Sequence, residues 1–127
     1  MEILEKLQAW LGNLPFWEGE LPEIDKLSVK PGAAGLFPQG QQVLSQKEDV
    51  LGNRKQVIRY TFLLKKDAIP GLSSALWCAK LQEAANHTPP QLGQTAFYAQ
   101  KGRLTKLPGT GLGTYEIQLM AEMEETL

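Results

Sequence analysis

The stretch RKQVIRYTFLLK, residues 54–65, decides the fold, because its side chains alternate with the two-residue period of a β-strand. One face collects large apolar or aromatic side chains, which we expect in the core: Ile58, Tyr60, Phe62 and Leu64. The opposite face is mixed and suits solvent or another subunit: Val57, Arg59, Thr61 and Leu63. The stretch therefore predicts a half-buried strand of a sheet.

A second strand candidate precedes this one over Gln41–Asp49. The residues between the two candidates, Val50-Leu51-Gly52-Asn53, contain a Gly-Asn pair, which favours a tight chain reversal. Two strand candidates joined by such a turn predict a long antiparallel β-hairpin.

The clearest strand signal comes last, over Thr114–Glu124. Its core face is predicted to carry Tyr115, Ile117, Leu119, Ala121 and Met123. Its outer face is predicted to be polar and mostly acidic, with Glu116, Gln118, Met120, Glu122 and Glu124. Because Thr95–Gln100 is also strand-like, the last third predicts another hairpin, whose loop covers Lys101–Gly113.

Two helices accompany these strands. Apolar residues recur at helical spacing near the N-terminus, at Ile3, Leu4, Leu7, Trp10, Leu11 and Leu14. This pattern predicts an amphipathic helix that ends near Asn13, before Pro15. A second helix is predicted from an N-cap at Ser73 or Ser74 to about Asn86, since Pro89-Pro90 then stops it.

The segment between the first helix and the first long strand is broken by proline and glycine. We expect residues 15–24 to form a connector packed on the core, although the aromatic pair Phe16-Trp17 also suits a subunit contact. The alternation in Leu27–Lys30 predicts a short strand. The order of elements predicts the α+β class: a mainly antiparallel sheet of about four to six strands with two helices packed on one face.

Length and composition limit the architecture and the partners. A chain of 127 residues suits a single domain, residues 1–127, and its 43% apolar content suits a packed core. The N-terminal residues lack the features of a signal peptide, and no apolar run is long enough to span a bilayer. We therefore expect a soluble protein made in the cytoplasm and no membrane partner. A net charge of −1 argues against tight direct nucleic acid binding.

No pattern of residues predicts an enzyme. The single cysteine, Cys78, falls in the second predicted helix and suits packing, and the only histidine, His87, falls near the end of that helix. The glycine-rich string over Gly109–Gly113 lacks the lysine and the spacing of nucleotide-binding loops. We therefore expect no catalytic residue, no cofactor and no metal.

Two segments are predicted to project as loops, near residues 31–40 and 101–113. The first carries Leu36 and Phe37, which either fold back on the core of their own chain or are buried on a neighbouring subunit. The second is predicted to be a mobile basic and apolar finger with Arg103, Leu104, Lys106 and Leu107. Long loops of this kind are often functional, so these six residues are candidate contacts to another subunit or to a partner protein.

Taken in order, the pieces of this chain resemble the small minor capsid or tail-terminator-like proteins of phages and prophages of Gram-positive bacteria. The resemblance rests on the order of an N-terminal helix, Gly35–Gly40, the turn Asp49–Asn53, the strand Tyr60–Leu64, a helix with Trp77, the break Pro89-Pro90 and the closing strand Tyr115–Leu119.

The resemblance implies a structural role in the virion without chemistry. Such proteins form a ring, commonly a hexamer, at the head-proximal end of the tail, where they stop growth of the tail tube and offer a surface to the head. The implied partners are further copies of the chain, the tail tube protein and a head-completion protein, in the host cytoplasm during assembly and then at the head–tail junction of the virion. The acids Glu116, Glu122 and Glu124 would face the channel and repel passing DNA. Two alternatives stay open: a head-completion or connector adaptor on the portal side, and a small ligand-binding domain.

Overall fold

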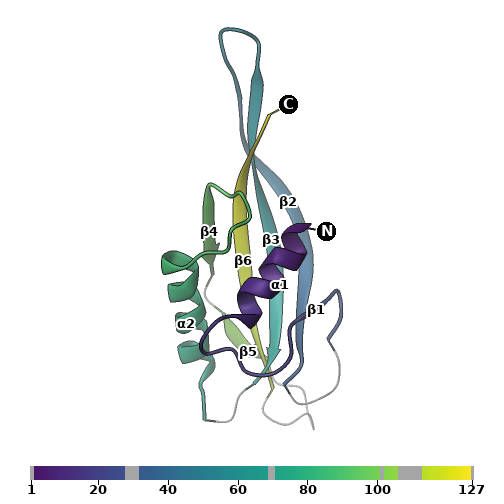
Figure 1. The fold of residues 1–127 in the computed structure, drawn as a ribbon, viewed down its shortest axis with the longest axis vertical. Coiled ribbons are helices and arrows are strands. Elements are labelled where there is room, and N and C mark those ends of the chain that lie inside the picture. The colour runs from purple at the N-terminus through teal and green to yellow at the C-terminus, as the bar shows by residue number, and fades with distance from the viewer. Residues whose placement is uncertain (1, 28–31, 69–70, 101, 106–112, 127) are drawn as a thin grey trace.

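The computed structural model describes residues 2–27, 32–68, 71–100, 102–105 and 113–126 (Figure 1). The helices are α1 (Glu2–Gly12) and α2 (Ser74–His87). The strands are β1 (Glu23–Ile24), β2 (Ala34–Glu48), β3 (Arg54–Asp67), β4 (Ala96–Ala99), β5 (Arg103–Thr105) and β6 (Thr114–Thr126). Two helices on a largely antiparallel sheet confirm the predicted α+β class.

The sheet runs in the order β1-β2-β3-β6-β4, and β5 also pairs with β6. Only the short β1 is parallel to its neighbour, β2. Because β3 occupies one edge of β6 along its length, β4 and β5 share the other edge. Ala99 lies opposite Leu119 and Arg103 opposite Glu116, so three residues separate these positions on the β4–β5 side and two on the β6 side.

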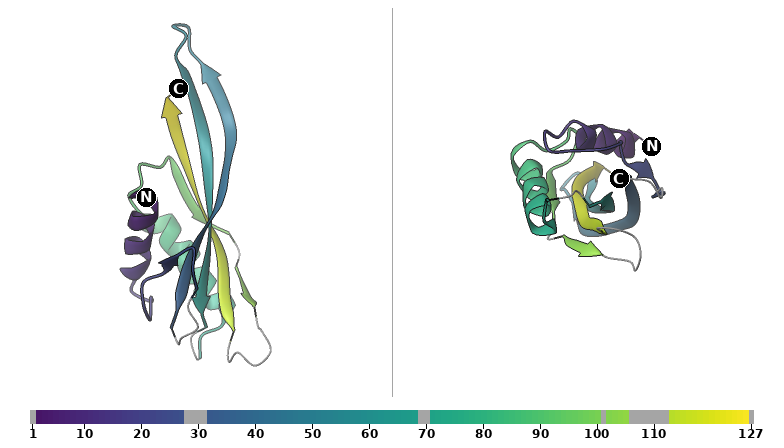
Figure 2. Two further views of the ribbon diagram at one scale, coloured as in Figure 1. Left: turned by 90° about the vertical axis from the view of Figure 1, so that its right-hand side faces the viewer. Right: turned by 90° about the horizontal axis from the view of Figure 1, so that it is seen from below.

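The helices and the sheet enclose one hydrophobic core. It includes Leu4, Leu7 and Leu11 of α1, Trp77, Leu81 and Ala85 of α2, and Phe62, Leu64, Ile117 and Leu119 of the central strands. Viewed end-on, the two helices lie on the outside of a strongly curled sheet (Figure 2). The predicted core face of β3 is confirmed at Ile58, Phe62 and Leu64, and Tyr60 packs against the core while half-buried.

Local signals explain the ends of the helices. Ser73 is the N-cap of α2, and its hydroxyl accepts a hydrogen bond from the backbone N–H of Leu76 at 3.2 Å. At the other end, the backbone N–H of Thr88 donates to the Ala84 carbonyl, directly before Pro89. The predicted start of α2 is thus confirmed, and α1 ends at Gly12, within a residue of expectation.

The predicted loop near residues 31–40 is wrong over most of its length, because β2 begins at Ala34. Leu36 lies opposite Leu64 of β3, and its side chain is fully buried in the core of its own chain. Pro38 and Gly40 flank a β-bulge, where a strand tolerates a missing N–H and a positive φ, here 105° at Gly40. Proline and glycine therefore mark an irregular strand here and not a loop.

Other boundaries also differ from expectation. The predicted connector contains β1, which pairs with the start of β2. Leu27 belongs to no strand, and the rest of the predicted strand Leu27–Lys30 lies outside the described residues. The predicted loop over Lys101–Gly113 contains β5, while residues 106–112 lie outside the described part of the chain.

The β2–β3 hairpin extends far beyond the helices, and the end of β6 accompanies its lower part (Figures 1 and 2). Every residue from Gln41 to Lys55 is exposed. We call residues 41–55 the arm. With an outgoing strand of eight residues, it reaches roughly 25 Å at about 3.3 Å per residue.

Candidate interaction surfaces

The tip of the arm is a turn fixed by Asp49. One oxygen of its carboxylate accepts hydrogen bonds from the backbone N–H groups of Leu51 and Asn53, both at 2.9 Å. The other oxygen accepts from the side-chain amide of Asn53 at 3.0 Å. The Asn53 side chain, and then its backbone, lower the pKa of Asp49 from its ordinary value, because both favour the ionised carboxylate. The turn is therefore stabilised by three hydrogen bonds to the Asp49 carboxylate, in addition to the backbone hydrogen bonds from Asp49 to Asn53 and from Gly52 to Asp49.

This turn presents two apolar side chains to solvent. Val50 is 101% exposed and Leu51 is 83% exposed. Further down the arm, Val43 and Leu44 are also exposed, next to the bulge between Val43 and Ser45. Single exposed apolar residues are common on proteins, but the adjacent Val50 and Leu51 at the end of a projecting hairpin are suited to contact with another protein.

The strands of the arm contact each other through weak, solvated side-chain pairs. Arg54 lies 3.9 Å from Glu48, and the side-chain amides of Gln46 and Gln56 lie 3.4 Å apart. Lys47 is directly opposite Lys55 in the register, which is an unfavourable like-charge pair. The arm therefore carries a positive charge that its own cross-strand neighbour does not neutralise.

At its base the arm is joined to the body by polar contacts across the sheet. Arg59 of β3 donates to Gln42 of β2 at 2.7 Å and to the hydroxyl of Tyr98 on β4 at 3.3 Å. The Tyr60 hydroxyl donates to Glu125 at 2.8 Å, and this hydrogen bond is the main reason why the pKa of Tyr60 is raised. These contacts link the base of the arm to β4 and β6.

Both outer edges of the arm region lack a neighbouring strand among the described residues. On β2, β1 pairs only with Gly35 and Leu36, so the edge is open from Pro38 to Glu48. On β6, β4 pairs only as far as Glu122, so the edge is open over residues 123–126. Open edges present backbone N–H and C=O groups that another strand can bind.

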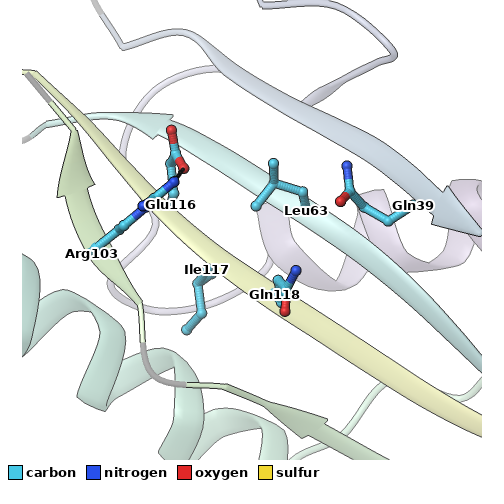
Figure 3. A pocket seen from close by; sticks show the side chains of 6 residues that line it. All are labelled: Gln39, Leu63, Arg103, Glu116, Ile117 and Gln118. Carbon is cyan, nitrogen blue, oxygen red and sulfur yellow. Dashed lines mark hydrogen bonds and ion pairs between the residues drawn. The ribbon is translucent and has the colours of Figure 1, made fainter. Parts of the chain in front are cut away.

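A shallow hollow of about 300 Å³ lies on the sheet, lined by Gln39, Leu63, Arg103, Glu116, Ile117 and Gln118 (Figure 3). Arg103 and Glu116 form an ion pair in it, with 3.2 Å between the guanidinium and the carboxylate. The two charges thereby neutralise each other, and the hollow is widely open to solvent. Among the described residues, no group of three or more His, Cys, Asp or Glu side chains could hold a metal ion.

The structure separates the residues predicted to form contact loops. Leu36 is buried in its own core, and Phe37 is half-buried with the Lys65 ammonium 5.5 Å from its ring centroid. Of the two alternatives for these residues, packing on the core of their own chain is therefore confirmed for Leu36, and the expectation of a projecting loop is wrong. Arg103 and Leu104 belong to β5 and do not form a finger, because β5 pairs with β6. Lys106 and Leu107 lie outside the described residues.

The predicted acidic row is also divided. Glu116 is buried and forms an ion pair with Arg103. The sequence analysis did not indicate this pair, because it placed Arg103 in a loop and not in a strand beside β6. Glu122 is half-buried, and Glu124 is exposed and lies 3.4 Å from Lys55. The three acids therefore do not form one solvated row, and a channel-facing role is not supported for Glu116.

Sequence reasoning missed Val50 and Leu51 as site residues. A signal existed, because a valine and a leucine stand between Asp49 and Gly52, in a turn where polar residues are usual. The packing interpretation of Cys78 agrees with the structure: the thiol is buried, and burial raises its pKa.

Comparison with known proteins gives no relative for this fold. No family model matches the chain, and neither a curated protein nor a solved structure matches it. In the part of the chain that the structure describes, no helix has both the length and the apolar character needed to cross a membrane.

Proposed function

We propose that this chain is a structural assembly subunit of a phage tail, a tail terminator or a closely related head–tail joining protein. In this role several copies form a closed ring, a hexamer, on the head-proximal end of the tail tube. The observation that carries the proposal is the arm, with Val50 and Leu51 exposed at a tip whose turn the Asp49 carboxylate stabilises. The resemblance in the order of sequence elements supports the same role.

The physical argument starts from exposed apolar area. Burial of such area is favourable by about 25 cal/mol per Å², so an apolar tip gains free energy when another protein covers it. A tip whose turn is already stabilised by hydrogen bonds also loses little conformational entropy on binding. A hairpin that reaches roughly 25 Å can make this contact beyond the boundary of its own subunit.

A closed ring also requires two different complementary surfaces on each subunit. The arm provides a convex surface with an apolar end. The body provides another exposed apolar side chain away from the arm, Leu21, which is about half exposed. Binding alone is then sufficient for the function, because the bound ring blocks addition of further tube subunits and offers its outer side to the head.

The test combines assembly with tube capping. The purified chain is mixed with the tube protein encoded in the same gene cluster, and tube lengths are measured by electron microscopy. We expect the chain to shorten or cap the tubes and the double variant V50S/L51S to lose this effect. Leu76→Ser, which removes an equally apolar side chain from α2, is the matched control and should retain capping.

Other outcomes contradict the proposal. If the wild-type chain binds the portal assembly and not the tube, the protein is a connector adaptor. If it leaves tube length unchanged and binds neither assembly, the role in tail assembly is wrong.

A further inference from the structure

The arm region has two open edges that differ in charge. The outer edge of β2 carries Lys47, with Lys55 and Arg54 beside it on β3. The open part of β6, residues 123–126, carries Glu124 and Glu125. Within one copy Lys55 already pairs with Glu124 at 3.4 Å and Arg54 lies 3.9 Å from Glu48, so Lys47 is the cation of this edge for which the described residues provide no anion. Lys47 and Glu124 cannot meet within one copy, because β3 lies between them, but they are complementary between copies.

We propose that the outer edge of β2 in one copy pairs with the open end of β6 in the next copy, so that the sheets of neighbouring subunits become continuous. This inference rests on the proposed ring function and names the contact that joins its subunits. The occupant of each edge is therefore a second copy of this chain.

The orientation of the strands agrees with a head-to-tail contact. β2 and β6 are both antiparallel to β3, so they are parallel to each other within one copy. If neighbouring copies have the same orientation in a continuous sheet, β2 of one copy therefore runs parallel to β6 of the next. The contact uses two different surfaces of the subunit, which is the heterologous type that closes into rings.

The side-chain faces also agree. In the register Lys47 is level with Lys55, and Val57 is level with Glu124, so Lys47, Lys55 and Glu124 lie on one face of the sheet. Within one copy Lys47 is level with Thr126, and Ser45 is level with Glu124. An offset of two residues between the paired edges therefore brings Lys47 beside Glu124 of the neighbour on that face. The like-charge pair of Lys47 and Lys55 is then relieved by an anion on the free side of Lys47.

Disulfide cross-linking tests this pairing directly. In the double variant K47C/E124C the two cysteines of one copy are about two strand spacings apart, roughly 10 Å, which is too far for a disulfide. Mild oxidation should therefore join different copies, giving a ladder of covalent oligomers on a non-reducing gel that ends at the closed ring. The matched control K47C/E83C, with its second cysteine on the exposed side of α2, should remain monomeric.

Charge reversal gives a second measurement that does not depend on cysteine chemistry. Lys47→Glu and Glu124→Lys should each weaken self-association about threefold, as expected for a partly exposed ion pair. The double variant K47E/E124K should recover most of the loss. Analytical ultracentrifugation measures all three against the wild type.

Several results would overturn the pairing. The first is that K47C/E124C remains entirely monomeric after oxidation. The second is that Lys47→Cys alone forms disulfide dimers, which would indicate symmetric pairing of two β2 edges. If tube capping persists in such a case, the proposed function stands without this contact. If the ladder forms but the chain neither caps tubes nor binds a portal assembly, the edge pairing stands and the tail function fails.

Discussion

Gly102 and Cys78 are in such close contact that no side chain fits between them. A Cβ atom built at Gly102 would lie 2.3 Å from the Cys78 sulfur and 2.6 Å from the Glu116 carbonyl oxygen. The glycine directly precedes β5, and Cys78 belongs to α2. This contact ties the edge of the sheet to the helix below it.

We predict that Gly102→Ala destabilises the protein by about 1–3 kcal/mol, because the backbone must move away from both neighbours. Chemical denaturation followed by tryptophan fluorescence measures this change. Adding Cys78→Ala should restore only part of the stability, since the clash with the Glu116 carbonyl remains. Gln100→Ala, at an exposed neighbouring position, is the control; an equal loss there would contradict the explanation.

Trp77 should contribute more to stability than any exposed residue of α2. It is fully buried and stacks on Tyr115 with 5.0 Å between ring centroids. Trp77→Ala should cost about 3–5 kcal/mol. Trp77→Phe should cost clearly less, since it keeps a stacked ring and removes an indole N–H that has no hydrogen-bond partner among the described residues. Leu76→Ala, half-exposed on the same helix, should change the free energy of unfolding by no more than about 0.5 kcal/mol.

Lys66 should make the stability of the protein depend on alkaline pH. Its side chain is buried, its ammonium donates to the Gly32 carbonyl at 3.2 Å and lies 5.5 Å from the Trp17 ring, and burial lowers its pKa. Because the folded state favours the neutral amine, the contribution of Lys66 to stability is complete above its unfolded pKa of about 10.5 and is lost as pH falls through the lower folded value.

The measurement is a comparison of the wild type with Lys66→Met by urea denaturation from pH 7 to pH 10. The free energy of unfolding of Lys66→Met, relative to that of the wild type, should be highest at pH 7. This difference should change in favour of the wild type as pH rises, because the wild type gains stability when Lys66 becomes neutral. Lys47→Met, at an exposed position on β2, is the control for general charge effects. A difference that is constant over this range, or that shifts toward the variant, would contradict the prediction.

Asp49 should control the order of the arm tip without controlling the stability of the body. Asp49→Ala removes the acceptors for Leu51 and Asn53, so amide exchange at these two residues should accelerate while the melting temperature changes little. Asp49→Asn keeps one acceptor oxygen and should be intermediate. Because the pKa of Asp49 is lowered, the wild-type turn should stay ordered above pH 4 and loosen only as pH falls through its folded pKa. Unchanged exchange in Asp49→Ala would show that the strands alone hold the turn.

The sequence allowed prediction of the elements whose signals are local. The turn at Gly52-Asn53, a closing strand at β6 and the N-cap at Ser73 each depend on residues close together in the chain, and all three are confirmed. The predicted alternation of burial along β6 is wrong at Glu116 and Met120, which are buried on the face that was expected to be exposed. Signals that depend on distant partners were not readable. Whether Pro38 and Gly40 make a loop or a bulge depends on the pairing of β2 with β3, and the burial of Glu116 depends on Arg103 across a strand of only three residues.

The candidate site shows the same division. The residues of the tip turn were predicted to reverse the chain, but the exposure of Val50 and Leu51 depends on how far the hairpin extends beyond the body. That distance follows from the long register of β2 with β3 and from helices that cover only the lower sheet. Local patterns do not contain this information.

The two bulges of β2 make the outer strand of the hairpin longer than the inner one. Ala34–Glu48 faces Arg54–Lys66, which is fifteen residues against thirteen. This mismatch in contour length coils the hairpin, and it sets the direction in which the tip points. Evolution or design could therefore redirect the tip by deleting a single residue, Gln39 or Leu44, without replacing any residue at the tip itself.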